Sequence, residues 1–184
     1  TQEIVTSDEN WKAATGAVVW SDIYDGEEYD ARLEKTGWDA AGFDDKDWKT
    51  VTAMDAPKAR IVAPAGPPVK KIEELGVAKV LKTPAGDTVL DMGQNLVGCV
   101  KFRVTAPAGS AISLRHAEVL DKSGNFYTAN LRTAKETIQY TTRGGGTEVY
   151  EPHFSFQGFR YVAVSGWPGA VSYTHLRAHE TKAN

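Results

Sequence analysis

Hydrophobic and polar residues alternate over short stretches along most of the chain. In the clearest stretch, Val100, Phe102 and Val104 alternate with Lys101 and Arg103. A period of two residues is typical of a β-strand that buries one face and exposes the other. We therefore predict a strand at residues 98–105, preceded by a shorter strand at residues 88–91 and a tight turn at Asp91–Asn95.

The same pattern, interrupted by turns rich in Gly and Pro, predicts an all-β protein. Further strands are expected at residues 29–33, 69–75, 77–82, 112–116, 136–142, 147–150 and 159–165, and a single helical turn or a long loop at 129–135. Short strands at this spacing are typical of β-sandwiches and jelly rolls. Pro57–Pro68 is rich in Pro, Ala and Gly, and we interpret it as the crossing between two β subdomains in tandem.

The last residues, Val171–Asn184, differ from the rest of the chain. They are polar, carry two of the four histidines, and resemble the translated sequencing-adapter tails that end unrelated reading frames. We therefore expect residues 170–184 to be a non-native or disordered tail.

Composition excludes some functions without choosing one. The 184 residues are 41% hydrophobic and 24% charged, with a net charge of −3. A nucleic-acid surface needs clustered Lys and Arg, which the sequence lacks, and no apolar run approaches the length of a membrane span. The one cysteine, Cys99, cannot form an internal disulfide, so the cellular compartment stays open.

An acidic turn is the most unusual local feature. Asp22, Asp25, Glu27, Glu28 and Asp30 surround a single glycine within SDIYDGEEYDAR. Several hard oxygen ligands could bind calcium, although their spacing does not match an EF-hand. We favour the alternative, in which the turn is solvated and its acids pair with Arg32 and with backbone amides.

Aromatic residues near this turn suggest sugar binding as a second interpretation. Tyr24, Tyr29 and Trp38 could offer flat faces to a sugar ring, while Asp25 and Glu27 accept hydrogen bonds from its hydroxyl groups. Aromatic side chains in a β-sandwich more often belong to the core, and we give that interpretation more weight.

The remaining reactive side chains are interpreted as structural. Glu118 is the most tempting single acid for glycoside chemistry, but we expect it to pair with Arg115 or to cap the turn at Asp121. His116 lies on the apolar face of its strand and is expected to be a satisfied core histidine. Cys99 has no basic neighbour or helix N-terminus and is expected to be an inert thiol.

Six phrases, in order from Ser21 to Gly169, resemble the bacterial α-L-rhamnosidases, a family of glycoside hydrolases. The phrases are SDIYDGEEYDAR, GWDAAGFDDKDW, APAGPPVKKIEEL, VLDMGQNLVGCVKF, LRHAEVLDKSGNFYTANLR and YEPHFSFQGFRYVAVSGWPG. No single phrase is decisive, but the ordered set is specific.

The resemblance implies a division of the chain. Residues 1–66 are expected to be the C-terminal part of a galactose-binding-like N-terminal β-sandwich that lacks its opening strands. Residues 67–169 are expected to be a concanavalin-like β-sandwich. The catalytic acid and base of the family lie in an (α/α)6 barrel, for which this sequence has no counterpart, so we expect no catalytic residue here.

The resemblance also implies a bacterial enzyme, secreted, periplasmic or cytoplasmic, that hydrolyses terminal α-L-rhamnosyl residues of glycans or glycosides. We expect this chain to support the barrel, with sugar recognition as a further role. The candidate sugar-binding residues are Asp25, Glu27, Asp30, Arg32 and Trp38. The alternatives are a calcium-assisted rhamnose-binding module and a purely structural interaction domain.

Overall fold

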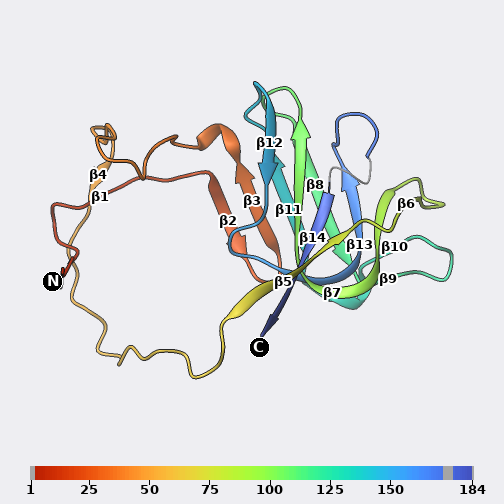
Figure 1. Ribbon diagram of the computed structural model, residues 1–184, viewed down its shortest axis with the longest axis horizontal. Coiled ribbons are helices and arrows are strands. Elements are labelled where there is room, and N and C mark those ends of the chain that lie inside the picture. The colour runs from red at the N-terminus through yellow and green to blue at the C-terminus, as the bar shows by residue number, and fades with distance from the viewer. Residues whose placement is uncertain (1–2, 172–175, 184) are drawn as a thin grey trace.

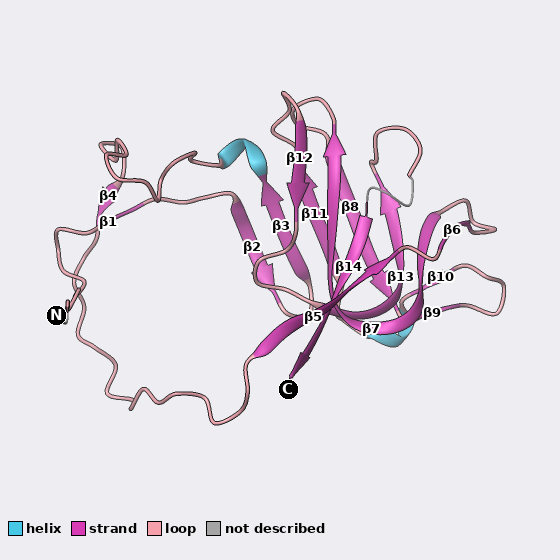
Figure 2. Ribbon diagram, in the orientation of Figure 1, coloured by secondary structure: helices cyan, strands magenta, loops and turns pink. Residues whose placement is uncertain are grey.

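The computed structural model describes residues 3–171 and 176–183, and its secondary structure is nearly all β (Figures 1 and 2). The all-β prediction is confirmed. The strands are β1 (Lys12–Ala13), β2 (Val18–Asp22), β3 (Gly26–Asp30), β4 (Lys49–Thr50), β5 (Val69–Gly76), β6 (Lys79–Lys82), β7 (Thr88–Thr105), β8 (Ala111–Ala117), β9 (Val119–Leu120), β10 (Phe126–Tyr127), β11 (Thr137–Thr141), β12 (Thr147–Tyr150), β13 (Gln157–Ser165) and β14 (Leu176–Ala183). The described residues also hold two short 3-10 helices, η1 (Ala31–Leu33) and η2 (Ala129–Leu131).

One curled sheet of ten strands dominates the molecule. Its main path runs β2-β3-β11-β8-β13-β7-β14-β5, and β6 and β12 also pair with β7. The pairs β1–β4 and β9–β10 form separate two-stranded sheets. The first half of β7 pairs with β6 and β13. Further along, β7 pairs with β12, β13 and β14. The long strand β7 therefore connects strands that lie at different places around the curled sheet.

The long strand β7 differs from the prediction of two strands separated by a tight turn. Its partner β13 pairs on both sides of the expected turn, with Phe159 opposite Leu96 and Tyr161 opposite Asp91. The intervening residues 92–95 therefore form a bulge opposite Arg160. Within the bulge, Gly93 has a φ of 86° and its N–H donates to Asp91 Oδ1 (2.7 Å).

The hairpin of β2 and β3 extends the main sheet, because β3 pairs in parallel with β11. The strand expected at residues 29–33 ends earlier, at Asp30, whose side chain accepts the N–H of Arg32 and begins η1. Part of the first 66 residues thus shares a sheet with the second subdomain. The division at residues 66 and 67 stays a prediction.

The end of the chain also differs from the expected tail. Residues 176–183 form β14, which lies between β5 and β7 in the sheet. The side chains of Leu176 and Ala178 are buried, while Arg177 between them is exposed. This short alternation of buried and exposed side chains is the period of a half-buried strand.

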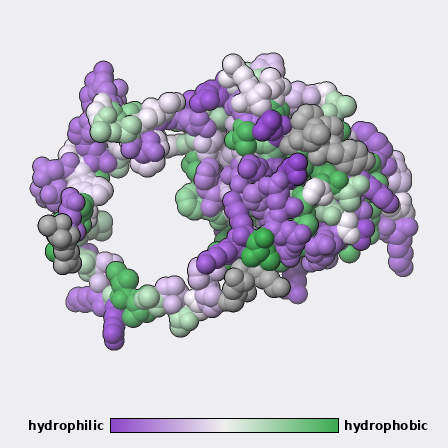
Figure 3. All heavy atoms as spheres, in the orientation of Figure 1, coloured by the Kyte–Doolittle hydropathy of each residue, from purple (hydrophilic) through white to green (hydrophobic). Residues whose placement is uncertain are grey.

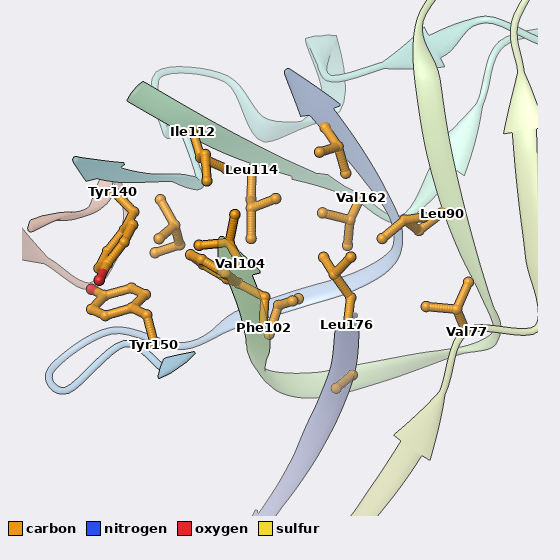
Figure 4. Packing of buried hydrophobic residues seen from close by; sticks show 14 of the residues in the cluster. Val77, Leu90, Phe102, Val104, Ile112, Leu114, Tyr140, Tyr150, Val162 and Leu176 are labelled. Carbon is orange, nitrogen blue, oxygen red and sulfur yellow. The ribbon is translucent and has the colours of Figure 1, made fainter. Parts of the chain in front are cut away.

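The core lies inside the curl of the sheet. Side chains from β7, β8, β11, β12, β13 and β14 point toward one another there (Figure 4). Phe102 is at its centre, with its ring edge against Tyr140 and Trp167. Burial of these apolar faces is the main force that holds the sheet in its curled form.

The first part of the chain contributes little to this core. Residues 51–68 contain no strand and run as a long loop from the β1–β4 pair to β5 (Figures 1 and 2). The space-filling view shows that this loop encloses an open space instead of packing against the sheet (Figure 3). Within the described residues, no helix has the length and apolar character needed to cross a membrane.

Candidate functional site

The acidic turn between β2 and β3 is built around its own backbone. Asp22 Oδ1 accepts the N–H groups of Tyr24 (2.7 Å) and Asp25 (2.9 Å). These two hydrogen bonds lower the pKa of the Asp22 carboxyl below its ordinary value. Asp22 is thus the acceptor that shapes the turn, a role for which Asp is commonly selected.

Two of the predicted sugar-binding acids have partners elsewhere on the surface. Asp25 accepts a hydrogen bond from Lys135 Nζ at 2.6 Å. Asp30 accepts from Arg32 through both Nε (2.9 Å) and Nη2 (2.7 Å), and this pairing is the chief cause of its lowered pKa. The carboxylates of Asp25 and Asp30 are therefore each paired with a cation of this chain.

Glu27 is completely buried, with 0% of its surface exposed. Its carboxylate accepts hydrogen bonds from the hydroxyl of Tyr150, from Ser21 Oγ (3.2 Å), and from the N–H groups of His153 (3.0 Å) and Phe154 (2.9 Å). A buried charge needs this degree of hydrogen bonding to be tolerated. Glu27 therefore fixes the loop at residues 151–156 against β3 and cannot reach a ligand in solvent.

Of the five candidate residues, Trp38 is the one that lines an open groove. This groove has a volume of about 710 Å³ and is bordered by residues 13–18, 34–39 and 48, and by Tyr29, Arg143, His153 and Phe154. Trp38 is 61% exposed. The structure thus separates Trp38 from the acids grouped with it, and a sugar-binding role for the five stays a prediction.

One wall of the groove is a hydrogen-bonded polar network. The Glu34 carboxylate accepts from the Tyr29 hydroxyl (2.8 Å) and from Arg143 Nη1 (2.7 Å). The Tyr29 ring also lies against the ring of His153, with 5.8 Å between their centres. These contacts fix the direction of the polar groups that face the groove.

The sequence did not indicate that Phe154, Glu34 and Arg143 would line the groove. Phe154 has a higher exposed fraction than Trp38, with 69% of its surface accessible. The alternation Phe154-Ser155-Phe156 was visible in the sequence, but it predicts a strand as readily as a binding loop. Glu34 and Arg143 are 109 residues apart in the chain, and no local pattern links them.

The predicted partners of Glu118 are wrong. Glu118 accepts hydrogen bonds from the side-chain amides of Asn95 and Asn130, both at 3.3 Å. Arg115 instead donates to Thr128 Oγ1 and lies over the ring of Phe126. The turn that begins at Asp121 is closed by Asp121 itself, which accepts the N–H groups of Ser123 and Asn125.

His116 is buried in the core, as predicted, but the prediction that it is satisfied is wrong for Nε2, which has no hydrogen-bond partner among the described residues. His116 is 0% exposed, and its Nδ1 lies 2.7 Å from the backbone oxygen of Glu136. Burial lowers the pKa of His116 to about 4 from its ordinary value of 6.5. The ring is therefore neutral at physiological pH, and it packs edge-on against Phe159.

Glu136 gives a testable pH dependence together with His116. Burial, with a smaller contribution from the Glu118 carboxylate, raises the pKa of Glu136 to about 7. The stability that Glu136 contributes is present below pH 4.5 and is lost as the pH rises toward 7. The contribution of His116 has the opposite sign, because stability falls as the pH drops from 6.5 toward 4.

We expect Glu136→Gln to be more stable than the parent protein at pH 7.5 and to lose this advantage by pH 4.5. The reason is that glutamine removes the cost of ionising a half-buried carboxyl group. Urea unfolding of both proteins at pH 4.5, 5.5, 6.5 and 7.5 measures the difference. Parallel stability profiles over this range would contradict the raised pKa of Glu136.

Cys99 is buried, as expected of an inert thiol. Its Sγ donates to Glu151 Oε1 at 3.2 Å. Burial, followed by this contact, raises the pKa of the thiol to about 12. The nucleophilic thiolate is therefore strongly disfavoured near neutral pH.

The described residues offer little to a metal ion. Within them, no group of three or more His, Cys, Asp or Glu side chains is placed to hold one. The acids of the β2–β3 turn already have Lys, Arg, Tyr or backbone partners. The predicted pairing holds for Asp30, which binds Arg32, and for Asp22, which accepts backbone N–H groups. The prediction of a solvated turn is wrong for Glu27, which is completely buried.

Comparison with known proteins gives two matches to family models. Residues 81–181 match the bacterial alpha-L-rhamnosidase concanavalin-like domain, and residues 1–73 match the alpha-L-rhamnosidase N-terminal domain. The matched segments together include the β2–β3 hairpin, the groove and almost the whole ten-stranded sheet.

Individual relatives are proteins named Alpha-L-rhamnosidase. One from Streptomyces avermitilis is 49% identical over 178 residues, which are 96% of this chain and 17% of that protein. One from Formosa agariphila is 38% identical over 164 residues, which are 89% of this chain and 18% of that protein. The chain thus spans about a sixth of the length of these curated relatives.

Solved structures agree with the sequence comparison. The Streptomyces avermitilis alpha-L-rhamnosidase, crystallised in complex with L-rhamnose, superposes with a TM-score of 0.92 and 47% identity, covering 100% of this chain and 18% of its own. The native Aspergillus terreus enzyme gives a TM-score of 0.92 and 42% identity, covering 98% of this chain and 21% of its own.

Proposed function

Because this chain belongs to the bacterial α-L-rhamnosidase family, we propose that it is a non-catalytic β-domain segment of such an enzyme. In this role it supports the (α/α)6 catalytic barrel that the family resemblance implies, and it takes part in sugar recognition. The parent enzyme hydrolyses terminal α-L-rhamnosyl residues of glycans or glycosides.

The observation that carries this proposal is the difference between the share of this chain that matches a rhamnosidase, 100%, and the share of that rhamnosidase that is matched, 18%. The whole chain superposes on a rhamnosidase with a TM-score of 0.92 while covering only 18% of that enzyme. The side-chain contacts agree with a structural role. Glu27, Asp25 and Asp30 are all bound by groups of this chain, which leaves them unsuited to act as a catalytic acid or base.

A chimeric enzyme tests the proposal. The whole chain, β14 included, replaces the corresponding segment of the Streptomyces avermitilis enzyme, which the 49% identity makes practicable. We expect the chimera to retain hydrolysis of 4-nitrophenyl α-L-rhamnoside and a deletion of the segment to abolish it. We expect the chain alone to give no turnover.

Two results would contradict the proposal. One is turnover of the aryl rhamnoside by the isolated chain that co-elutes with it through a second purification step. The other is full activity of the deletion variant, because a supporting domain cannot be dispensable for the part it supports.

A further inference from the structure

Strand β14 lies between two strands of the main sheet and is antiparallel to both. It pairs with β7 over Leu176–Glu180 and with β5 over Arg177–Ala183. We call the space between β5 and residues 98–102 of β7 the strand slot. Among the described strands, β5 pairs only with β14, and residues 99–101 of β7 also pair only with β14. Without a strand in the slot, both edges would therefore present unpaired backbone N–H and C=O groups.

Two side chains of β14 belong to the core cluster. Leu176 is 1% exposed and Ala178 is 0% exposed. Leu176 lies opposite Phe102, and Ala178 lies opposite Val100 (Figure 4). Because Phe102 and Val100 fill the core from the neighbouring strand, the slot takes one large apolar side chain and, two residues later, a small one.

The side chains on the other face of β14 have a smaller part in holding it. Arg177 and Glu74 pair at 3.2 Å, but both side chains are about half exposed, and such pairs contribute little. His179 Nδ1 lies 3.5 Å from Glu151 Oε1. Glu151 also pairs with Lys71, so it keeps a partner when another residue replaces His179.

At Gly98 the slot approaches the main chain of β14 closely. A Cβ atom added to Gly98 would overlap the backbone oxygen of His179. This oxygen is present whatever residue occupies position 179. The close contact therefore depends on an extended backbone and not on a particular side chain.

The sequence around β14 gives little indication of a strand. It is polar and resembles translated adapter tails, yet residues 176–183 lie in the sheet. A slot that holds such a segment makes few demands on sequence. This is typical of β-strand addition, in which main-chain hydrogen bonds give affinity and pockets for alternate side chains give specificity.

We propose that the strand slot is a binding site for an extended peptide segment that presents a large apolar side chain and, two residues later, a small one. Hydrogen bonds to the main chains of β5 and β7 supply affinity, and the positions of Leu176 and Ala178 supply selectivity. In this chain β14 occupies the site, so a segment of another chain binds once β14 is withdrawn. The inference does not depend on the proposed function.

A full-length variant with a vacated slot tests the proposal. Leu176→Asp combined with Ala178→Asp would bury two carboxylates in the core, which should withdraw β14. A fluorescein-labelled synthetic peptide of residues 174–184 is titrated against this variant and against the parent chain by fluorescence anisotropy. We expect the variant to bind the peptide at least about tenfold more tightly, because β14 of the parent competes at a high effective concentration.

Two altered peptides are matched controls for this titration. A peptide that carries Leu176→Asp and Ala178→Asp should bind the vacated slot at least about tenfold more weakly than the unaltered peptide. A peptide that carries Arg177→Thr and His179→Thr should bind within about threefold of it, because these side chains lie outside the core.

Hydrogen exchange gives a second measurement that does not require a vacated slot. Gly98→Ala pushes away the backbone of His179, so amide exchange in β5 and β14 should accelerate relative to the parent chain. Gly76→Ala, at the end of β5, is the matched control, because nothing lies within 4 Å of its added Cβ. We expect Gly76→Ala to leave these exchange rates unchanged.

Three results would overturn the proposal. They are equal peptide affinity for the parent and the double variant, equal binding of the unaltered and the Asp-substituted peptides, and β14 amides in the parent that exchange as fast as those of the free peptide. If the double variant does not fold, the exchange experiment decides. Equal rates in Gly98→Ala and Gly76→Ala would then contradict the close fit of the slot to a strand backbone.

Discussion

Replacing Glu27 by alanine is expected to lower the free energy of unfolding by about 3–5 kcal/mol. The carboxylate is completely buried and accepts hydrogen bonds from the Tyr150 hydroxyl and from the N–H groups of His153 and Phe154. Alanine leaves these donors without an acceptor in a site that excludes water, and each unpaired donor is costly. Urea unfolding followed by circular dichroism measures the loss.

Glu28→Ala is the matched control for this prediction. Glu28 is the next residue of β3, but its carboxylate faces the surface and accepts a hydrogen bond from Trp20 Nε1 at 2.8 Å. Exposed interactions of this kind contribute little, and we expect a change of no more than about 0.5 kcal/mol. Equal losses in the two variants would contradict the special role of Glu27.

Gly26→Ala is expected to detach the β2–β3 hairpin from the main sheet. Gly26 has a φ of 111°, and a Cβ atom there would lie 2.0 Å from the backbone oxygen of Thr137 in β11. That distance is far below van der Waals contact, and the obstacle is backbone, so β3 and β11 must separate. We expect a loss of about 2–4 kcal/mol, since both steric overlap and backbone strain oppose the native pairing.

Gly37→Ala separates these two causes. Gly37 also has a positive φ, 80°, but nothing lies within 4 Å of the position of its Cβ. It should cost only the backbone strain, about 1 kcal/mol. Hydrogen exchange of the β11 amides should accelerate in Gly26→Ala and stay unchanged in Gly37→Ala. Retained protection in Gly26→Ala would show that the parallel β3–β11 pairing tolerates a side chain.

Much of the fold could be predicted from local pattern. The alternation around Phe102, the Gly-rich and Pro-rich turns and the short strand spacing were sufficient to predict an all-β protein. Strand β12 and the turn that begins at Asp121 lie where the sequence placed them. These features depend on neighbouring residues, and their physical causes act within a few positions along the chain.

The candidate site could be predicted only in part. Trp38 was named from its residue type, and it does line the groove. Phe154 was not named, because its exposure depends on a loop that Glu27 holds from 127 residues away. The bulge in β7 was likewise predicted as a turn, since only the pairing with β13 keeps both halves of the strand in one sheet.

The sequence by itself determined that strands form, where most of them turn, and which family the chain resembles. Tertiary structure alone decided which acids are buried and which remain in solvent. Glu27 and Glu28 are identical in type and adjacent in sequence, yet β3 turns one toward Tyr150 and the other toward Trp20. The reason is that burial and charge pairing are set by contacts between distant segments, which no local pattern records.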